Sequence, residues 1–226
     1  MKLRLHSAVT LLAAAAAIAA APGALAQAAG QWTAKAGVGK ITPKVTSGDV
    51  SAPALPGSKA DVGPDTQPVF AVAYGMTDNW SVELDLGLPY THEISGAGAI
   101  EGTGKLGTVK SLPPTLFAHY HFFKPEAVVR PYVGVGATYA YFTDTRGSGK
   151  MTALSDIGGP PTTFKIKSKL AATFQIGAAY NINANWFIDA NISKTFLKTK
   201  VTFSSGQTQD MKLDPQAVTL TLGYKF

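Results

Sequence analysis

The sequence predicts an all-β protein: an eight-stranded antiparallel transmembrane β-barrel with short periplasmic turns and long extracellular loops. Three observations predict this fold. The chain begins like a secreted protein, its body alternates apolar with polar residues, and it ends on an aromatic residue, Phe226. Membrane-spanning β-strands have this alternation, and aromatic residues mark their ends at the membrane surface.

The first 26 residues have the pattern of a secretory signal peptide. Lys2 and Arg4 precede an alanine-rich apolar run over 8–21, and Ala24-Leu25-Ala26 fits the cleavage site. The run is too short and too poor in Leu and Ile for a typical membrane helix, although an uncleaved anchor is the alternative. We therefore expect a signal peptide over 1–26 and an outer-membrane barrel domain over 27–226.

Eight later segments have a period of two, as β-strands do. The last one has an apolar face composed of Val218, Leu220, Leu222, Tyr224 and Phe226. Small or polar residues form its other face, so lipid would contact one side and the barrel interior the other. The expected strands lie at 32–39, 70–74, 80–88, 115–122, 133–141, 170–180, 186–193 and 217–226.

The links between these strands alternate in length, which orients the barrel. Short links lie at 75–79, 123–131 and 181–185, and two of them have the same Tyr-x5-Trp spacing. Longer segments rich in Gly, Pro, Ser and Lys lie at 46–66, 91–110, 144–167 and 200–214. Outer-membrane barrels have short periplasmic turns and long external loops, so both chain ends should be periplasmic.

A β-sandwich is the main alternative, because its strands alternate in the same way. Sandwiches have edge strands that are usually blunted by charge or proline. Here the apolar face is continuous on all eight segments and carries few charges. This continuity favours the barrel.

Composition restricts the function. Cysteine is absent, so the chain has no disulfide, thiolate metal site or cysteine nucleophile. The formal charge is +6, and without the signal peptide 18 basic residues face 14 acidic ones. The basic residues are scattered along the sequence, which therefore predicts no basic patch and contains no nucleic-acid motif. The weakly basic surface could contact anionic lipid head groups.

The polar faces of the strands should point into the lumen, where the charged and histidine residues are Glu83, Asp85, His119, His121 and Asp189. The two histidines could hold a metal with a third ligand, or act with a carboxylate in acid–base chemistry. We favour a hydrogen-bonded interior network. Inward glycines either leave space for a channel or allow close strand packing.

Apolar residues in the long loops would be unfavourable in water, so they should pack together as a cap above the lumen. Such a cap would form an apolar vestibule for a hydrophobic solute, or simply a small core of the loops. The expected entrance residues are Leu55, Ile94, Ile100, Leu154, Phe164 and Leu170.

Several motifs occur together in a characteristic order. They are Pro89-Tyr90-Thr91-His92-Glu93-Ile94, Leu112-Pro113-Pro114-Thr115-Leu116, Arg130-Pro131-Tyr132-Val133-Gly134, Leu154-Ser155-Asp156 and Leu213-Asp214-Pro215. In this order the chain resembles the OmpW family of small outer-membrane proteins over its whole mature length. The resemblance implies an eight-stranded barrel that passes small hydrophobic molecules. One departure is Leu170, where some relatives place a tryptophan.

We therefore expect passive uptake of small hydrophobic molecules across the outer membrane of a Gram-negative bacterium, without a cofactor. The expected partners are outer-membrane lipid, the solute, and the assembly machinery through Phe226, with no nucleic acid; the oligomeric state stays open. The prolines at 113–114 either start a strand rigidly or weaken the wall for a lateral exit.

Two alternatives stay open. A lipid-modifying barrel enzyme would need a nucleophile and a base at the rim. Ser111 and Ser168 lie near strand ends, but neither has a histidine close in sequence. A structural or adhesive barrel would act through its loops.

Overall fold

The computed structural model describes residues 29–155, 158 and 160–226. The expected signal peptide lies outside the described residues. Among these residues, no helix is long and apolar enough to cross a membrane.

Eight antiparallel strands close into a barrel, because β1 pairs with both β15 and β4 and the ladder continues around the ring. Every segment expected to be a barrel strand is one. The strands in ring order are β1 (Trp32–Thr42), β4 (Asp65–Gly75), β5 (Trp80–Gly87), β8 (Thr115–His121), β9 (Val129–Gly147), β11 (Lys169–Asn181), β12 (Trp186–Thr195) and β15 (Gln216–Lys225).

Alternation along each strand separates an apolar outer wall from a polar interior. On β15, Val218, Leu220 and Leu222 are about half exposed, while Thr221 is buried. A soluble protein would bury such a continuous apolar surface, whereas lipid stabilises it. The outer wall is therefore the lipid-facing surface.

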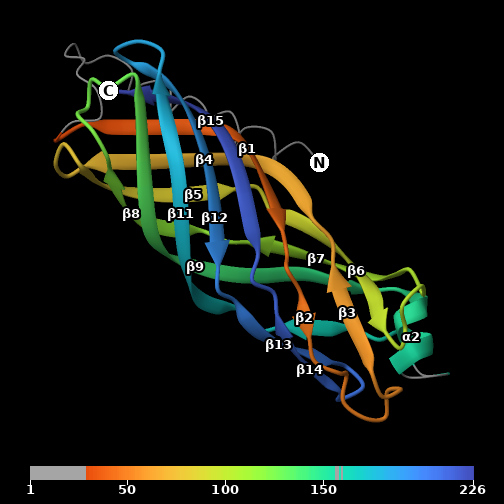
Figure 1. Ribbon diagram of the computed structural model, residues 1–226. Helices are drawn as coiled ribbons and strands as arrows, with labels where there is room; N and C mark the ends of the chain where they lie inside the picture. The colour runs from red at the N-terminus through yellow and green to blue at the C-terminus, as the bar shows by residue number, and fades with distance from the viewer. Residues whose placement is uncertain (1–28, 156–157, 159) are drawn as a thin grey trace, which may run out of the picture.

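The short turns lie at one end of the barrel together with the C-terminus (Figure 1). Aromatic rings form a girdle there. The ring centroids are 5.0 Å apart for Trp32 and Tyr74, 5.2 Å for Trp80 and Tyr120, and 4.9 Å for Trp186 and Tyr224. Phe226 closes the ring by exchanging two backbone hydrogen bonds with Trp32. This end is the periplasmic one.

The four long connections contain strands and one helix, which the sequence did not predict. They contain β2 (Thr46–Ser47), β3 (Ser58–Val62), β6 (Tyr90–Gly98), β7 (Lys105–Leu112), β10 (Phe164–Ile166), β13 (Lys198–Phe203), β14 (Thr208–Lys212) and the helix α2 (Gly149–Ser155). We call these elements and the outer part of β9 the outer extension. Figure 1 shows β3, β13, β14 and α2 at the end opposite the C-terminus.

The outer extension has its own apolar core between two groups of strands. Strand β6 pairs with β3 and β7, and β7 pairs with β9. A separate sheet has the order β10-β13-β14-β2. The core between them contains Val62, Ile94, Leu106, Val109, Met151, Phe164, Val201 and Met211. This core is continuous with the mouth of the barrel.

Candidate functional site

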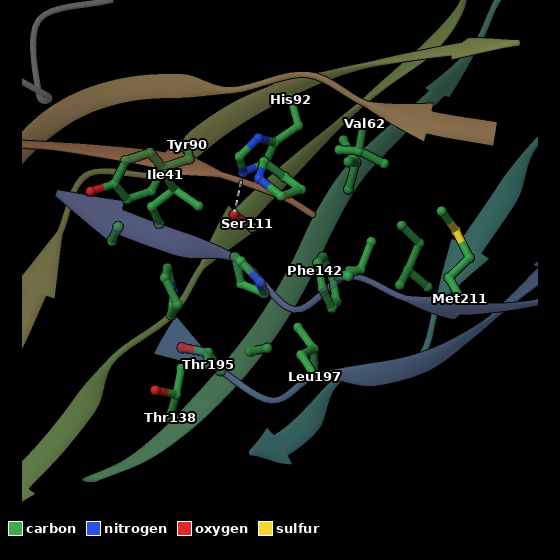
Figure 2. A pocket seen from close by; sticks show the side chains of 18 of the residues that line it. Ile41, Val62, Tyr90, His92, Ser111, Thr138, Phe142, Thr195, Leu197 and Met211 are labelled. Atoms are coloured by element: carbon green, nitrogen blue, oxygen red, sulfur yellow. Dashed lines mark hydrogen bonds between the residues drawn. The ribbon is translucent and has the colours of Figure 1, made fainter. Parts of the chain in front are cut away.

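A cavity of about 200 Å³ extends from the core of the outer extension into the upper half of the barrel. Its outer part is lined by apolar side chains such as Val62, Phe142 and Met211, and a band of polar groups follows below (Figure 2). An apolar cavity with few polar groups is the usual form of a small-molecule site.

Four of the six expected entrance residues line this cavity: Ile94, Ile100, Leu154 and Phe164. They come from β6, the turn after it, α2 and β10, which are far apart in sequence. Ile94 and Phe164 are buried, whereas Leu154 is 38% exposed. The packing of the outer extension brings these four side chains together.

The other two expected entrance residues lie elsewhere. Leu170 is 70% exposed on the outer wall. It lies on the same face of β11 as Ala172 and Phe174, and it pairs with Tyr139 of β9. Leu55 is 60% exposed in the turn before β3. Neither lines the cavity. Leu170 therefore belongs to the lipid-facing surface.

A hydrogen-bonded pair, His92 and Ser111, lies at the level where the barrel meets the outer extension. His92 Nε2 is 3.1 Å from Ser111 Oγ (Figure 2). His92 Nδ1 is 2.9 Å from the carbonyl oxygen of Gly63. Nδ1 must donate to that carbonyl, so Nε2 accepts from the serine hydroxyl. Burial holds the pKa of His92 below its usual value.

Sequence reasoning missed this pair because the two residues are 19 positions apart. The β6–β7 hairpin places Tyr90 opposite Ser111, which brings His92 beside it. Recognising 90–112 as a hairpin would have revealed the contact. A serine donating to an oriented histidine is the arrangement of an activated nucleophile, and it also ties β6 and β7 to Gly63.

The floor of the cavity is a buried polar network around Lys35. Lys35 Nζ lies 2.6 Å from Glu83 Oε1 and 3.5 Å from Asp189 Oδ1. Tyr132 donates to Asp189 over 3.0 Å, and Asn191 does the same. Asp85 lines the cavity just above the network.

The two interior histidines have separate partners. His119 Nε2 lies 2.6 Å from Gln175 Oε1, and His121 Nε2 lies 2.9 Å from Ser81 Oγ. The centroids of their two rings are 6.0 Å apart. Within the described part of the chain, no group of three or more His, Asp or Glu residues has the arrangement of a metal site. The pair therefore belongs to the interior hydrogen-bonded network.

Below Lys35 the lumen is filled by rings that lie over inward glycines. A Cβ at Gly223 would overlap the Phe187 ring, and one at Gly177 would overlap Tyr132. Gly134 makes the same room for His119, and Gly136 does so for Phe117, which lines the cavity itself. Phe187 is 0% exposed. These glycines therefore accommodate aromatic rings and leave no open channel at this level.

The barrel wall is interrupted beside the cavity. The ladder between β5 and β8 ends at Asp85 and Thr115, and pairing resumes between Tyr90 and Ser111. Among the described residues, no ladder pair joins 86–89 to 112–114. Pro113 and Pro114 lack the N–H that a ladder needs. Leu86, Gly87 and Pro113 line the cavity, so the interruption reaches it.

Comparisons with known proteins agree with this fold. The model of the OmpW family matches residues 28–226. Outer membrane protein W of Salmonella typhi is 37% identical over 171 residues, which cover 74% of this chain and 76% of that protein. The dibenzothiophene metabolism operon protein PahQ of Pseudomonas aeruginosa is 27% identical over 176 residues, which cover 76% and 77%. The crystal structure of OprG from Pseudomonas aeruginosa superposes with a TM-score of 0.79 at 27% identity, covering 88% of this chain and 97% of that one.

Proposed function

Because this chain belongs to the OmpW family and is an outer-membrane protein of a Gram-negative bacterium, we propose that it carries small hydrophobic molecules passively across the outer membrane. The observation that carries the proposal is the cavity, whose outer part is lined by apolar side chains of the outer extension. A hydrophobic solute gains free energy when it leaves water for such a lining.

The buried polar network at the floor of the cavity favours a lateral exit of the solute into the membrane over passage down the barrel. A neutral apolar solute would have to displace the Lys35–Glu83–Asp189 network and the rings below it, which would leave buried charges without partners. The interrupted ladder at 86–89 and 112–114 offers a shorter path from the cavity to lipid. The solute would then leave through the wall into the membrane.

The name of one relative supports the same solute class. PahQ is named for an operon of dibenzothiophene metabolism, and dibenzothiophene is an apolar aromatic compound. Uptake of such a compound needs an apolar binding surface, and the side chains of the outer part of the cavity form one.

A liposome assay tests the proposal. Purified protein is reconstituted, and entry of a fluorescent hydrophobic probe is compared with entry of a small ion. Ile100→Asp and Leu154→Asp, which alter the cavity lining, should slow probe entry several-fold. Leu55→Asp is the matched control, because Leu55 is exposed on the same extension and does not line the cavity.

Heat-modified mobility on a gel would verify that each variant is folded. Equal probe entry in all four proteins would contradict the proposal. Ion passage without probe entry would indicate a polar pore instead.

The Ser111–His92 pair favours a second candidate, an acyl-transfer enzyme of the barrel type. A fluorophosphonate probe would form a covalent bond to an activated serine. Labelling that is lost in Ser111→Ala and His92→Gln, but kept in Ser168→Ala, would support this candidate. Absence of labelling in the folded wild-type protein would remove it.

A further inference from the structure

On the outer surface of β12 and β13, lysines follow the lipid-facing residues along the chain. Along β12 and β13 the outward positions are apolar up to Ile192, then become Lys194, Phe196, Lys198 and Lys200. Ile192 and Phe196 are both about half exposed. The change from apolar to cationic residues places these lysines where the hydrocarbon of the outer leaflet ends.

Neighbouring strands add lysines to the same face. Lys40 of β1 and Ile192 of β12 both pair with Val218 of β15, so Lys40 lies at the level of the last apolar residue. In the sheet of the outer extension, Lys198 pairs directly with Lys212. Lys165 of β10 is exposed on that sheet, opposite Thr202. We call these residues the lysine face: Lys40, Lys165, Lys194, Lys198, Lys200 and Lys212.

Few acids compensate the lysine face. Lys200 Nζ is 3.5 Å from Asp210 Oδ1, and Lys212 Nζ is 3.2 Å from Asp214 Oδ2. Lys198 and Lys212 are cross-strand partners of like charge, which is unfavourable unless an anion lies between them. Six lysines therefore face two aspartates, one of which is largely buried.

The opposite flank has a different charge arrangement. Lys105 Nζ is 3.2 Å from Glu93, and Lys110 and Arg146 both bind Asp144 at 2.9 and 2.8 Å. Their hydrogen bonds hold the pKa of Asp144 below its usual value. Lys105, Lys110 and Arg146 are thus paired within the chain, whereas the lysine face keeps an excess of positive charge.

We propose that the lysine face binds the phosphate groups of lipopolysaccharide, the phosphorylated glycolipid of the outer leaflet. The occupant follows from position: the lysines continue the lipid-facing wall without a break, so the nearest anions are those on the lipid whose acyl chains contact Ile192 and Phe196. Lysine ammonium groups bind phosphate as flexible point charges. The bound glycolipid would also cover the like-charged pair Lys198 and Lys212.

Native mass spectrometry of the detergent-purified, delipidated protein tests this proposal. The test variant carries Lys165→Gln, Lys198→Gln, Lys200→Gln and Lys212→Gln. The control carries Lys59→Gln, Lys105→Gln, Lys110→Gln and Lys150→Gln, which remove the same charge from the rest of the outer extension. Each protein is titrated with phosphorylated lipid A, with dephosphorylated lipid A, and with inorganic phosphate.

Wild-type protein should bind phosphorylated lipid A roughly tenfold or more tightly than the test variant does, and added salt should weaken this binding. The control should stay within about twofold of wild type, since its lysines lie on the other flank or are already paired. Folding is checked by heat-modified mobility.

Three results would overturn the proposal. Equal binding of dephosphorylated lipid A would mean that the acyl chains alone are recognised. Binding of inorganic phosphate at the same concentrations would mean that the ligand is free phosphate. An equal loss in the control variant would mean that net charge, rather than this face, attracts the lipid.

Discussion

At the floor of the cavity, Lys35 is the one cation that contacts both Glu83 and Asp189 within the described residues. Its side chain is almost completely buried, as is that of Glu83. Removing one partner of such a pair leaves an uncompensated charge in a low-dielectric interior. The stability of the barrel should therefore depend strongly on this residue.

Lys35→Met should lower the free energy of unfolding by about 3–5 kcal/mol. The double variant Lys35→Met/Glu83→Gln should recover part of the loss, because it removes one of the two carboxylates that lose their cation in Lys35→Met. Urea unfolding of the reconstituted barrel measures both. Additive losses in the double variant would show that the two side chains do not interact.

His92 should make the junction between barrel and outer extension sensitive to acid. Its pKa is lowered in the folded protein, chiefly by burial, so the unfolded chain binds the proton more readily. The contribution of neutral His92 to stability is then fully present at neutral pH, and it is lost as the pH falls below the ordinary histidine pKa of about 6.5. The protection factors of the amides over 90–112, which are corrected for the intrinsic pH dependence of exchange, should fall between pH 7.5 and pH 5, values chosen as about one unit or more on either side.

His92→Gln supplies the control for this pH effect. The amide can keep a hydrogen bond to Ser111 or Gly63 but does not titrate. Exchange over 90–112 in the variant should change with pH only by the intrinsic chemistry of amides. An unchanged acid response would assign it to another group.

The sequence identified the inward polar residues but not their partners, because partners depend on the shear of the barrel. His119 of β8 reaches Gln175 of β11, two strands away, by crossing the backbone at Gly134 of β9. A single strand contains no information about this crossing. Ser111 and His92 were missed for a different reason, because the hairpin of β6 and β7 that brings them together was not recognised.

At the scale of elements, the inward glycines specify how aromatic rings fill the barrel interior. Gly136→Ala and Gly223→Ala would force Phe117 and Phe187 to move within a closed wall. Each should lower the free energy of unfolding by about 1–3 kcal/mol. Gly149→Ala is the control, because a Cβ there meets open space, and equal losses in all three would contradict the argument.

The orientation of each barrel strand can be tested with arginine. Val135 and Leu222 face lipid and are about half exposed, whereas Thr219 lines the cavity. Val135→Arg and Leu222→Arg should cost roughly 2–4 kcal/mol near the membrane centre, while Thr219→Arg should assemble. Yield of heat-modifiable protein in the outer membrane measures the difference. Equal tolerance of all three variants would mean that this assignment of the two faces is wrong.

The eight barrel strands were predictable because lipid enforces one apolar face from end to end. The strands of the outer extension were not, although they also alternate: Val201 and Met211 are buried, while Lys200 and Lys212 are exposed. Their outward residues are the Lys, Thr and Asp of ordinary loops. Only the pairing of distant segments distinguishes these strands from loops, and that pairing is tertiary.

At the scale of the whole molecule, the barrel and the outer extension divide the cavity into two chemical zones. Apolar residues from β3, β6, β10, β13 and α2 surround the outer zone. Lys35 and its partners close the inner one. An eight-stranded barrel is just wide enough for its interior to be filled by side chains, so a few rings suffice to close it.

Removing two of these rings should open the barrel. Tyr132, which donates to Asp189 of the network, and Phe187 are buried side chains that lie against Gly177 and Gly223. Tyr132→Ala/Phe187→Ala should raise small-ion conductance in a planar bilayer several-fold over wild type, because water can then fill the lower lumen. Tyr139→Ala/Tyr141→Ala removes two rings from the lipid-facing side and should leave conductance unchanged. If both double variants conduct like wild type, the closure lies elsewhere, and the argument for a lateral route loses its main support.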